Sequence, residues 1–225
     1  MRQFRLIPAK IIIFAVAIWL IIMEVIRKTS DKYKVVLSDE SIRELASILE
    51  LKEYQRDEII LGQGQVSRYM YIVEKGIVRQ FYYKEGRNIT EHFSCEGDIV
   101  TCLESLFLRK PTRLCVEAIE SSIIYLVDYE KFKDLSGKYS DINKLYQSSR
   151  EYMLVVSQRK ADSSRFARSH ERYERFLRES PDAEKRASRA HIASYLLMAT
   201  ETGSYIHLSL PTKMDGCITV VAHTV

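Results

Sequence analysis

The stretch from Tyr69 to Asp98 constrains most strongly what this chain can fold into. Three segments rich in β-branched and aromatic residues, Tyr69–Val73, Ile77–Tyr83 and Ile89–Phe93, follow one another with only short polar turns between them. In the second of these turns, Gly86 can adopt the positive φ that a tight reversal needs. Because turns this close together leave no room for helices between the strands, the spacing predicts a compact antiparallel β-roll rather than a parallel sheet.

The composition of the 225-residue chain is that of an ordinary folded protein, with 46% hydrophobic and 28% charged residues. The formal net charge of +4 is small, but the segment from Arg159 to Arg189 contains ten Lys and Arg residues and only six Asp and Glu residues. A basic segment of this kind suits a polyanionic partner. A solvated helix face explains it equally well.

The four cysteines form no CxxC pair, so neither a zinc site nor a disulfide framework is expected; they are Cys95, Cys102, Cys115 and Cys217. Scattered cysteines of this kind are typical of a protein in a reducing cytosol. The sequence has no Walker-type loop, HExxH or GxSxG motif. A single histidine on a strand, His92, is more often an ordinary residue than a haem ligand. We therefore expect no enzyme activity, no cofactor and no metal.

The first 27 residues form an apolar N-terminal segment with two main interpretations. The uncharged run Ile11–Met23 has 13 residues, and as a helix it reaches only about 20 Å, short of a ~30 Å hydrocarbon core. A membrane anchor would therefore have to place Lys10 and Glu24 near the headgroups. The other interpretation is that translation starts at Met23 and the preceding residues are upstream sequence. A secretory signal is disfavoured because no small-residue cleavage site follows.

Further elements are expected on both sides of the central stretch. Ser38 is a helix N-cap, and apolar residues at helical spacing continue to Leu51. The period then changes to that of a strand over Glu53–Leu61. The other expected elements are a short helix within Ile99–Leu108, strands Leu114–Ala118 and Ser122–Val127, and a helix from about Tyr129 capped by Asp128.

A long helix without Gly or Pro is expected from Asp141 to Arg165. Residues at alternating three- and four-residue steps give it a face typical of a two-helix seam; they are Ile142, Leu145, Ser149, Tyr152 and Val156. The alternative is that this face packs on the chain's own roll. A dimer seam is favoured, because so long a helix has more surface than a small roll can cover.

The C-terminal part of the chain has short helical segments. A domain boundary is expected near Ala161–Ser164, followed by a helix over Glu171–Glu179 and a break at Ser180-Pro181-Asp182. Two further helices are expected over Ala190–Leu197 and about Thr200–Leu208.

The order of these elements, together with several short motifs, resembles the Crp/Fnr family of transcription regulators. The motifs are Gly62-x-Gly64, Tyr71-Ile72-Val73-x-x-Gly76-x-Val78, Glu96-Gly97-Asp98-Ile99, Glu171-Arg172-Tyr173-x-x-Phe176-Leu177 and Ile192-Ala193-Ser194-Tyr195-Leu196. The resemblance covers roughly Ser38 to Leu208. It implies an α+β chain with an N-terminal antiparallel, jelly-roll-like β-roll flanked by helices, a long dimerisation helix, and a small helical, winged-helix-like C-terminal domain.

The domain division that follows from the resemblance has five parts. Residues 28–140 are expected to form a cyclic-nucleotide-binding-like sensor, 141–163 the dimerisation helix, and 164–208 a helix-turn-helix domain. Residues 1–27 are the apolar segment, and residues 209–225 are an atypical tail that does not resemble the family's wing.

The expected effector pocket, formed by Thr101, Cys102, Leu103, Thr112 and Arg113, departs from the cyclic-nucleotide pattern. Family members that bind cAMP have a Gly-Glu-Leu triplet where this chain reads Thr101-Cys102-Leu103, and an arginine where it has Thr112. In an extended strand, the neighbouring Arg113 would point to the opposite face unless Pro111 introduces a bulge. A lost charge-assisted phosphate contact costs ~1.5–3 kcal/mol. We therefore expect that cAMP is not the effector.

The expected recognition helix also departs from the family. The residues expected to contact DNA are Thr200, Glu201, Thr202, Ser204, Tyr205 and His207. Tyr205 and His207 stand where related sequences have arginines, which make the commonest specific contact with guanine. Gly203 replaces an apolar packing residue and costs roughly 1 kcal/mol in a helix. DNA binding is thus expected to be weakened and not abolished.

Taken with these departures, the resemblance implies a cytoplasmic, homodimeric DNA-binding transcription regulator that reads a palindromic operator. Its other expected partners are a small-molecule effector and RNA polymerase. The alternative is a degenerate or membrane-tethered cyclic-nucleotide-binding-like module without DNA-binding activity. A membrane partner is expected only if residues 11–23 are a genuine anchor.

Overall fold

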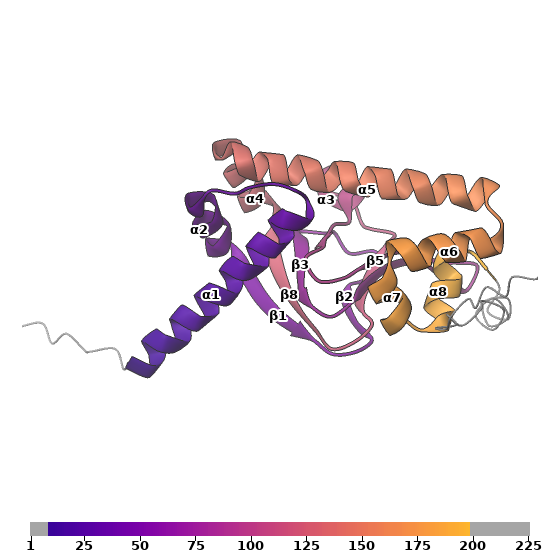
Figure 1. The fold of residues 1–225 in the computed structure, drawn as a ribbon, viewed down its shortest axis with the longest axis horizontal. Coiled ribbons are helices and arrows are strands. Elements are labelled where there is room, and N and C mark those ends of the chain that lie inside the picture. The colour runs from indigo at the N-terminus through magenta and orange to yellow at the C-terminus, as the bar shows by residue number, and fades with distance from the viewer. Residues whose placement is uncertain (1–8, 199–225) are drawn as a thin grey trace, which may run out of the picture.

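The computed structural model describes residues 9–198 and shows an α+β chain (Figure 1). Its helices are α1 (Ala9–Lys32), α2 (Asp39–Ser47), α3 (Leu103–Leu108), α4 (Tyr129–Lys138), α5 (Ser140–Phe166), α6 (Ser169–Glu179), α7 (Pro181–Arg186) and α8 (Arg189–Tyr195). Its strands are β1 (Leu49–Tyr54), β2 (Glu58–Leu61), β3 (Tyr69–Lys75), β4 (Val78–Lys84), β5 (Arg87–Ser94), β6 (Ile99–Val100), β7 (Cys115–Ala118) and β8 (Ser122–Asp128).

The strands form two four-stranded antiparallel sheets, ordered β1-β8-β3-β6 and β2-β7-β4-β5. The predicted β-roll is therefore confirmed. The strands of the opening stretch are shared between the sheets, because β3 lies in one and the β4–β5 hairpin in the other. Val73, Val78, Val116 and Ile124 are fully buried within one core cluster that draws on both sheets. The alternating β-branched pattern thus fills the roll.

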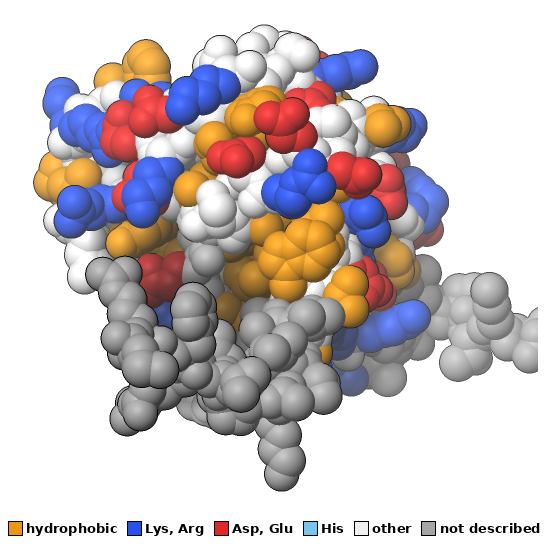
Figure 2. Space-filling model, turned by 90° about the vertical axis from the view of Figure 1, so that its left-hand side faces the viewer, with side chains coloured by type: hydrophobic (Ala, Val, Ile, Leu, Met, Phe, Trp, Pro, Cys, Tyr) orange, Lys and Arg blue, Asp and Glu red, His pale blue; other side chains and the backbone are white. Residues whose placement is uncertain are grey.

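A second core lies beneath α1, α2, α4 and α5. Met23 and Ile26 from the end of α1 belong to it, so α1 crosses the boundary expected between residues 27 and 28. In Figure 1, the earlier turns of α1 project away from the roll. Within the described residues, no helix is both long enough and apolar enough to span a bilayer. On the face of the molecule shown in Figure 2, acidic and basic side chains of residues 9–198 are interspersed, and no large patch of them has charges of only one sign.

Two helix caps that were predicted from the sequence are present. The Ser38 hydroxyl accepts a hydrogen bond from the Ser41 backbone N–H at the start of α2. Asp128 accepts from the N–H groups of Glu130 and Lys131 at the start of α4. Because each cap satisfies backbone donors that the helix itself leaves free, these residues fix where the helices begin.

The helix expected to continue to Leu51 instead ends at Ser47. Leu49–Tyr54 form β1 and pair in register with β8, from Leu49 opposite Val127 to Tyr54 opposite Ser122. The expected strand Glu53–Leu61 is correspondingly split between β1 and β2, and Asp57 adopts a positive φ of 65° in the turn between them. Pairing with residues 68 to 78 positions away in sequence, from Tyr54 with Ser122 to Leu49 with Val127, overrides the local helical spacing.

The C-terminal elements differ from their expected bounds in several places. Helix α5 continues through the expected boundary at Ala161–Ser164 and ends at Phe166, and α6 begins two residues before the expected Glu171. Pro181 begins helix α7, where the sequence predicted only a break; proline suits the first turn, because its missing N–H has no helical partner there anyway. Helix α8 ends two residues before the expected Leu197. The expected helix 200–208 and the tail 209–225 lie outside the described residues.

The expected dimer seam is divided between two environments. Ile142, Leu145 and Ser149 are buried in the chain's own fold, and Ile142 and Leu145 belong to the second core. Asp141 anchors this end of α5 to α2, because its carboxylate accepts from the Ser41 hydroxyl (2.6 Å) and the Ser38 N–H (2.8 Å). The first half of the predicted seam therefore packs within the chain, as the alternative interpretation required.

Replacing Gly76 by alanine is expected to destabilise the roll by about 2–4 kcal/mol. Gly76 has a φ of +104°, and an added Cβ would lie 2.1 Å from the Ser122 Oγ and 2.8 Å from the Ser122 Cα. Gly86→Ala is the matched control, since Gly86 also has a positive φ but no atom within 4 Å of the added Cβ. Urea unfolding should show a loss of only about 1–2 kcal/mol for the control. Equal losses would contradict the steric argument.

Candidate functional site

A cavity of about 620 Å³, here called the roll pocket, opens where the β4–β5 hairpin, α3 and the segment before β7 meet. Its volume lies in the range of small-molecule sites. Its lining residues are Gln63, Tyr82, Tyr83, Lys84, Glu91, Cys102, Glu104, Ser105, Thr112, Arg113 and Leu114. Of the five expected effector residues, the structure thus brings together Cys102, Thr112 and Arg113.

The other two expected residues, Thr101 and Leu103, line a neighbouring groove of about 290 Å³ between the roll and α5. They flank Cys102 on a segment that leads from β6 into α3. Consecutive side chains on this segment point in different directions, so the two neighbours of Cys102 miss the roll pocket. Sequence reasoning in turn missed the β4 residues Tyr82, Tyr83 and Lys84, whose only signal was their position at the end of an aromatic strand.

Arg113 lines the same pocket as Thr112, an arrangement that the sequence allowed only if the backbone near Pro111 departs from an extended strand. The expectation assumed an extended strand, but β7 begins only at Cys115 and the backbone bends at Arg113. Thr112 is buried and held by its backbone, which accepts from the Gly64 N–H and donates to the Gln65 carbonyl, each at 2.8 Å. The Thr112 hydroxyl accepts from the Leu114 N–H at 3.0 Å. Thr112 is therefore committed to loop structure, and Arg113 is the free, exposed cation.

Cys102 is only 1% exposed. The side-chain amide of Gln80 donates to its sulfur at 3.8 Å and to the Thr101 carbonyl at 3.0 Å. Burial raises the pKa of the Cys102 thiol to about 11, although hydrogen bonds from Gln80 and Thr112 oppose that shift. The position that carries a carboxylate in cAMP-binding members of the resembled family thus holds a neutral thiol at pH 7.

The remaining charges of the roll pocket come from Lys84, Arg113, Glu91 and Glu104. Glu91 is paired with Lys160 of α5 at 3.2 Å. Burial lowers the pKa of the Lys160 ammonium, and the Glu91 carboxylate opposes that shift. With Glu91 neutralised, two cations and one carboxylate remain. The lining therefore carries a small excess of positive charge, which suits an anionic ligand.

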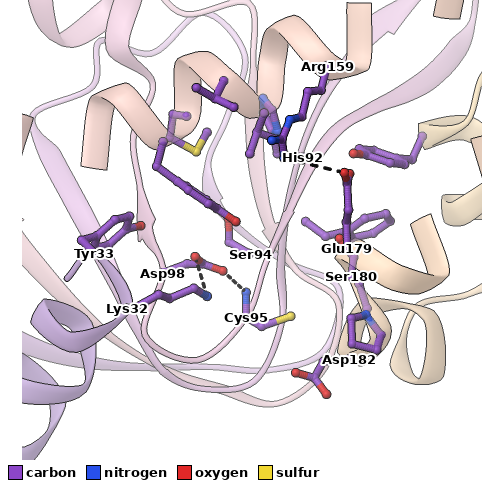
Figure 3. A pocket seen from close by; sticks show the side chains of 18 of the residues that line it. Lys32, Tyr33, His92, Ser94, Cys95, Asp98, Arg159, Glu179, Ser180 and Asp182 are labelled. Atoms are coloured by element: carbon purple, nitrogen blue, oxygen red, sulfur yellow. Dashed lines mark hydrogen bonds and ion pairs between the residues drawn. The ribbon is translucent and has the colours of Figure 1, made fainter. Parts of the chain in front are cut away.

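A cavity of about 690 Å³ lies between the roll, α5 and the C-terminal helices (Figure 3). We call it the interdomain cavity. On its roll side, Asp98 pairs with Lys32 at 2.7 Å and accepts from the Cys95 N–H at 2.8 Å. His92 also lines it; burial and the nearby Lys160 lower the pKa of this imidazole to about 4, so it is neutral at pH 7. No group of side chains in the described residues is arranged to hold a metal ion.

All six residues expected to contact DNA, from Thr200 to His207, lie outside the described residues. The helix expected to precede them is present as α8 and packs on β5. Its Ile192 and Leu196 join Tyr173 and Phe176 of α6 in a small core of their own. The C-terminal helices thus have a separate hydrophobic centre.

Comparison with known proteins supports a cyclic nucleotide-binding domain in this chain, because residues 51–139 match the family described as "Cyclic nucleotide-binding domain". No curated protein matches the sequence significantly. Among solved structures, FixK2 from Bradyrhizobium japonicum is similar with a TM-score of 0.63 and 24% identity, over 72% of this chain and 84% of that one.

Two further structures have the same fold. The c-di-GMP-responsive global regulator CLP from Xanthomonas campestris gives a TM-score of 0.63 and 15% identity, over 77% of this chain and 91% of that one. A CooA mutant from Carboxydothermus hydrogenoformans gives 0.59 and 16%, over 72% and 76%. Residues 51–139 are therefore similar to a cyclic nucleotide-binding domain, and the fold of the chain is similar to those of solved regulators, among them a protein from Eubacterium rectale that is assigned to the Crp/Fnr family.

Cys102 is expected to resist alkylation by iodoacetamide at pH 8 in the folded protein, since the thiolate is the reactive form. With a pKa of about 11, the rate should rise roughly tenfold per pH unit between pH 8 and pH 10. Peptide mapping by mass spectrometry would follow this cysteine separately, with the urea-unfolded chain as the control. A rate that levels off below pH 9 would contradict the assigned environment.

Proposed function

We propose that this chain is a homodimeric, DNA-binding transcription regulator of Crp/Fnr type whose effector is not cAMP. The roll pocket is the observation that supports an effector other than cAMP. At the two positions that would hold the cyclic nucleotide, it has the neutral thiol of Cys102 and the hydroxyl of Thr112, which accepts a hydrogen bond from the Leu114 N–H of its own loop. CLP, a regulator with a similar fold, is described as responsive to c-di-GMP. A different anionic effector is consistent with the exposed Arg113 and Lys84.

The DNA-binding part is supported by the C-terminal helices. Much of the basic segment is used within the chain, because Lys160 pairs with Glu91 and Arg186 with Glu96. Other basic side chains of the segment are exposed over α5 to α8; they are Arg165, Arg168, Arg178, Lys185 and Arg189. Exposed cations around a helix-turn-helix supply the phosphate contacts that orient such a domain on a duplex.

The dimer part is supported by the second half of α5. Beyond the buried Ser149, its apolar side chains reach solvent: Tyr152 is 48%, Leu154 59% and Val155 43% exposed. Leu154 borders the same groove as Leu103 of α3, which is 44% exposed, and Phe107 further along α3 is 74% exposed. An apolar surface on two neighbouring helices suits a second copy of the chain. The proposed seam therefore centres on Leu154 and Leu103. Tyr152 and Val156 of the predicted seam line the cavity on the other side of α5, and Tyr152 packs against Tyr33 with ring centroids 5.8 Å apart.

Leu154→Arg is expected to convert a dimer into a monomer, because it would place a charge in the centre of the proposed seam. Analytical ultracentrifugation of the full chain measures this directly. Leu51→Arg is the matched control, since Leu51 on β1 is 47% exposed. It lies in the sheet β1-β8-β3-β6 and not in the sheet of β4 and β5, whose residues border the groove beside Leu154. A monomeric wild-type chain, or equal dissociation of both variants, would overturn the dimer.

Selection of bound sites from a random DNA pool is expected to recover a palindrome with half-sites about one helical turn apart. On that site, the logarithm of the affinity should fall steeply and linearly with the logarithm of the salt concentration, and added cAMP should leave the affinity unchanged. Tighter DNA binding with cAMP would contradict the effector assignment. Absence of any enriched sequence would favour the second candidate, a cyclic-nucleotide-binding-like module without DNA-binding activity, which the projecting α1 also allows.

A further inference from the structure

The contacts between the roll and the C-terminal helices contain a charged cluster that neither the pocket nor the dimer seam explains. The Arg186 guanidinium of α7 donates two hydrogen bonds to Glu96, at 3.0 and 2.8 Å. It also bonds to Glu120, including a close contact between Nη2 and Oε1. Glu96 follows β5 and Glu120 lies between β7 and β8, so one side chain of α7 joins two separate turns of the roll. We call this three-residue cluster the Arg186 latch.

The contacts of the Arg186 latch stabilise the charged form of the Glu96 carboxylate. Burial alone would raise the pKa of Glu96, but hydrogen bonds from Arg186 and from the Gly76 N–H lower it to about 2. The Gly76 N–H donates at 2.9 Å, so the turn between β3 and β4 holds this carboxylate in place. Two carboxylates that converge on one point repel each other unless a cation lies between them. Removing the guanidinium therefore leaves two partly buried carboxylates without their cation.

Two further contacts lie beside the latch. Phe93 of β5 packs against Phe176 of α6 and Tyr195 of α8, with ring centroids 6.0 and 5.5 Å apart. Ser194 of α8 accepts from the Thr90 N–H at 2.7 Å and donates to the Asn88 carbonyl at 3.1 Å. The helix expected to enter the DNA-binding motif thus has one face turned to β5 and away from solvent.

This interface is not close-packed. The interdomain cavity separates Asp98 and Cys95 on the roll from Ser180 and Asp182 on the C-terminal helices (Figure 3). Beside this gap of about 690 Å³, the apolar contact that the described residues make between the two parts is limited to Phe93 and Cys95 of the roll, which pack at the edge of the C-terminal cluster. Such an interface can open while both parts stay folded, because each has its own hydrophobic cluster.

We propose that the Arg186 latch holds α6–α8 docked on the roll in a resting state, and that opening it frees the DNA-binding region. The inference rests on the proposed function. In a helix-turn-helix the first helix crosses the DNA backbone, and docking directs Ser194 of this helix to Thr90 instead. The latch is therefore an autoinhibitory contact. An effector that binds in the roll or in the interdomain cavity, and that moves Glu96 and Glu120 apart, would act through this latch.

The test compares the full chain with Glu96→Gln/Glu120→Gln, which keeps side-chain shape and removes both charges. The matched control is Glu50→Gln/Glu53→Gln, the same charge change on two exposed glutamates of β1. Hydrogen exchange by mass spectrometry should be roughly 10-fold faster over β5 and α8 in the latch variant, and unchanged in the control. Affinity for the selected DNA site should rise by about 10-fold.

The outcomes separate the latch from the proposed function. Unchanged exchange over α8 would overturn the latch, whether or not the chain binds DNA. Faster exchange with unchanged or weaker DNA affinity would overturn the autoinhibitory role. Faster exchange in a chain that selects no DNA would support docking by the latch but overturn both its autoinhibitory role and the proposed function. If the double variant exchanges faster in β3 and β8 as well, it has unfolded globally, and Arg186→Lys decides by the same readouts, since it keeps the charge and loses the bidentate geometry.

Discussion

The buried ion pair between Arg79 and Glu117 is the interaction on which the arrangement of the strands and of α8 depends. Arg79 is 3% exposed, and its guanidinium charge must be neutralised in place. Glu117 of β7 does this at 2.5 Å, while Asn88 and Thr90 of β5 accept at 3.3 Å. Thr90 in turn bonds to Ser194 of α8. One charge on β4 therefore fixes two neighbouring strands and the helix outside them.

Such a buried pair adds little net stability, because desolvation offsets most of the attraction. Its effect is on arrangement, since no other register of β4 against β7 would bring Arg79 opposite Glu117. The same network makes the outer face of this sheet polar where α8 docks. A polar interface of this kind opens more readily than an apolar core, and the proposed regulator would require this property.

The roll pocket shows how a fold can be kept while its charge pattern changes. The strands, the glycine turns and α3 match the sequence expectations for a cyclic nucleotide-binding domain, and residues 51–139 match that family. Within this frame, Cys102 is neutral and Thr112 is bound to its own loop. Arg113 reaches the pocket because the backbone bends before β7; the alternation rule holds only for an extended strand, and the sequence left a departure near Pro111 open.

The sequence by itself determined the roll, the caps at Ser38 and Asp128 and the long helix α5, because hydrophobic period and turn chemistry are local properties. Only the tertiary structure decided that Leu49–Leu51 form a strand, that Ile142 and Leu145 face the chain's own core, and that Arg186 reaches Glu96 and Glu120. Each of these depends on a partner far away in sequence. Local patterns cannot reveal such partners, since the free energy of pairing and burial is gained only when distant segments meet.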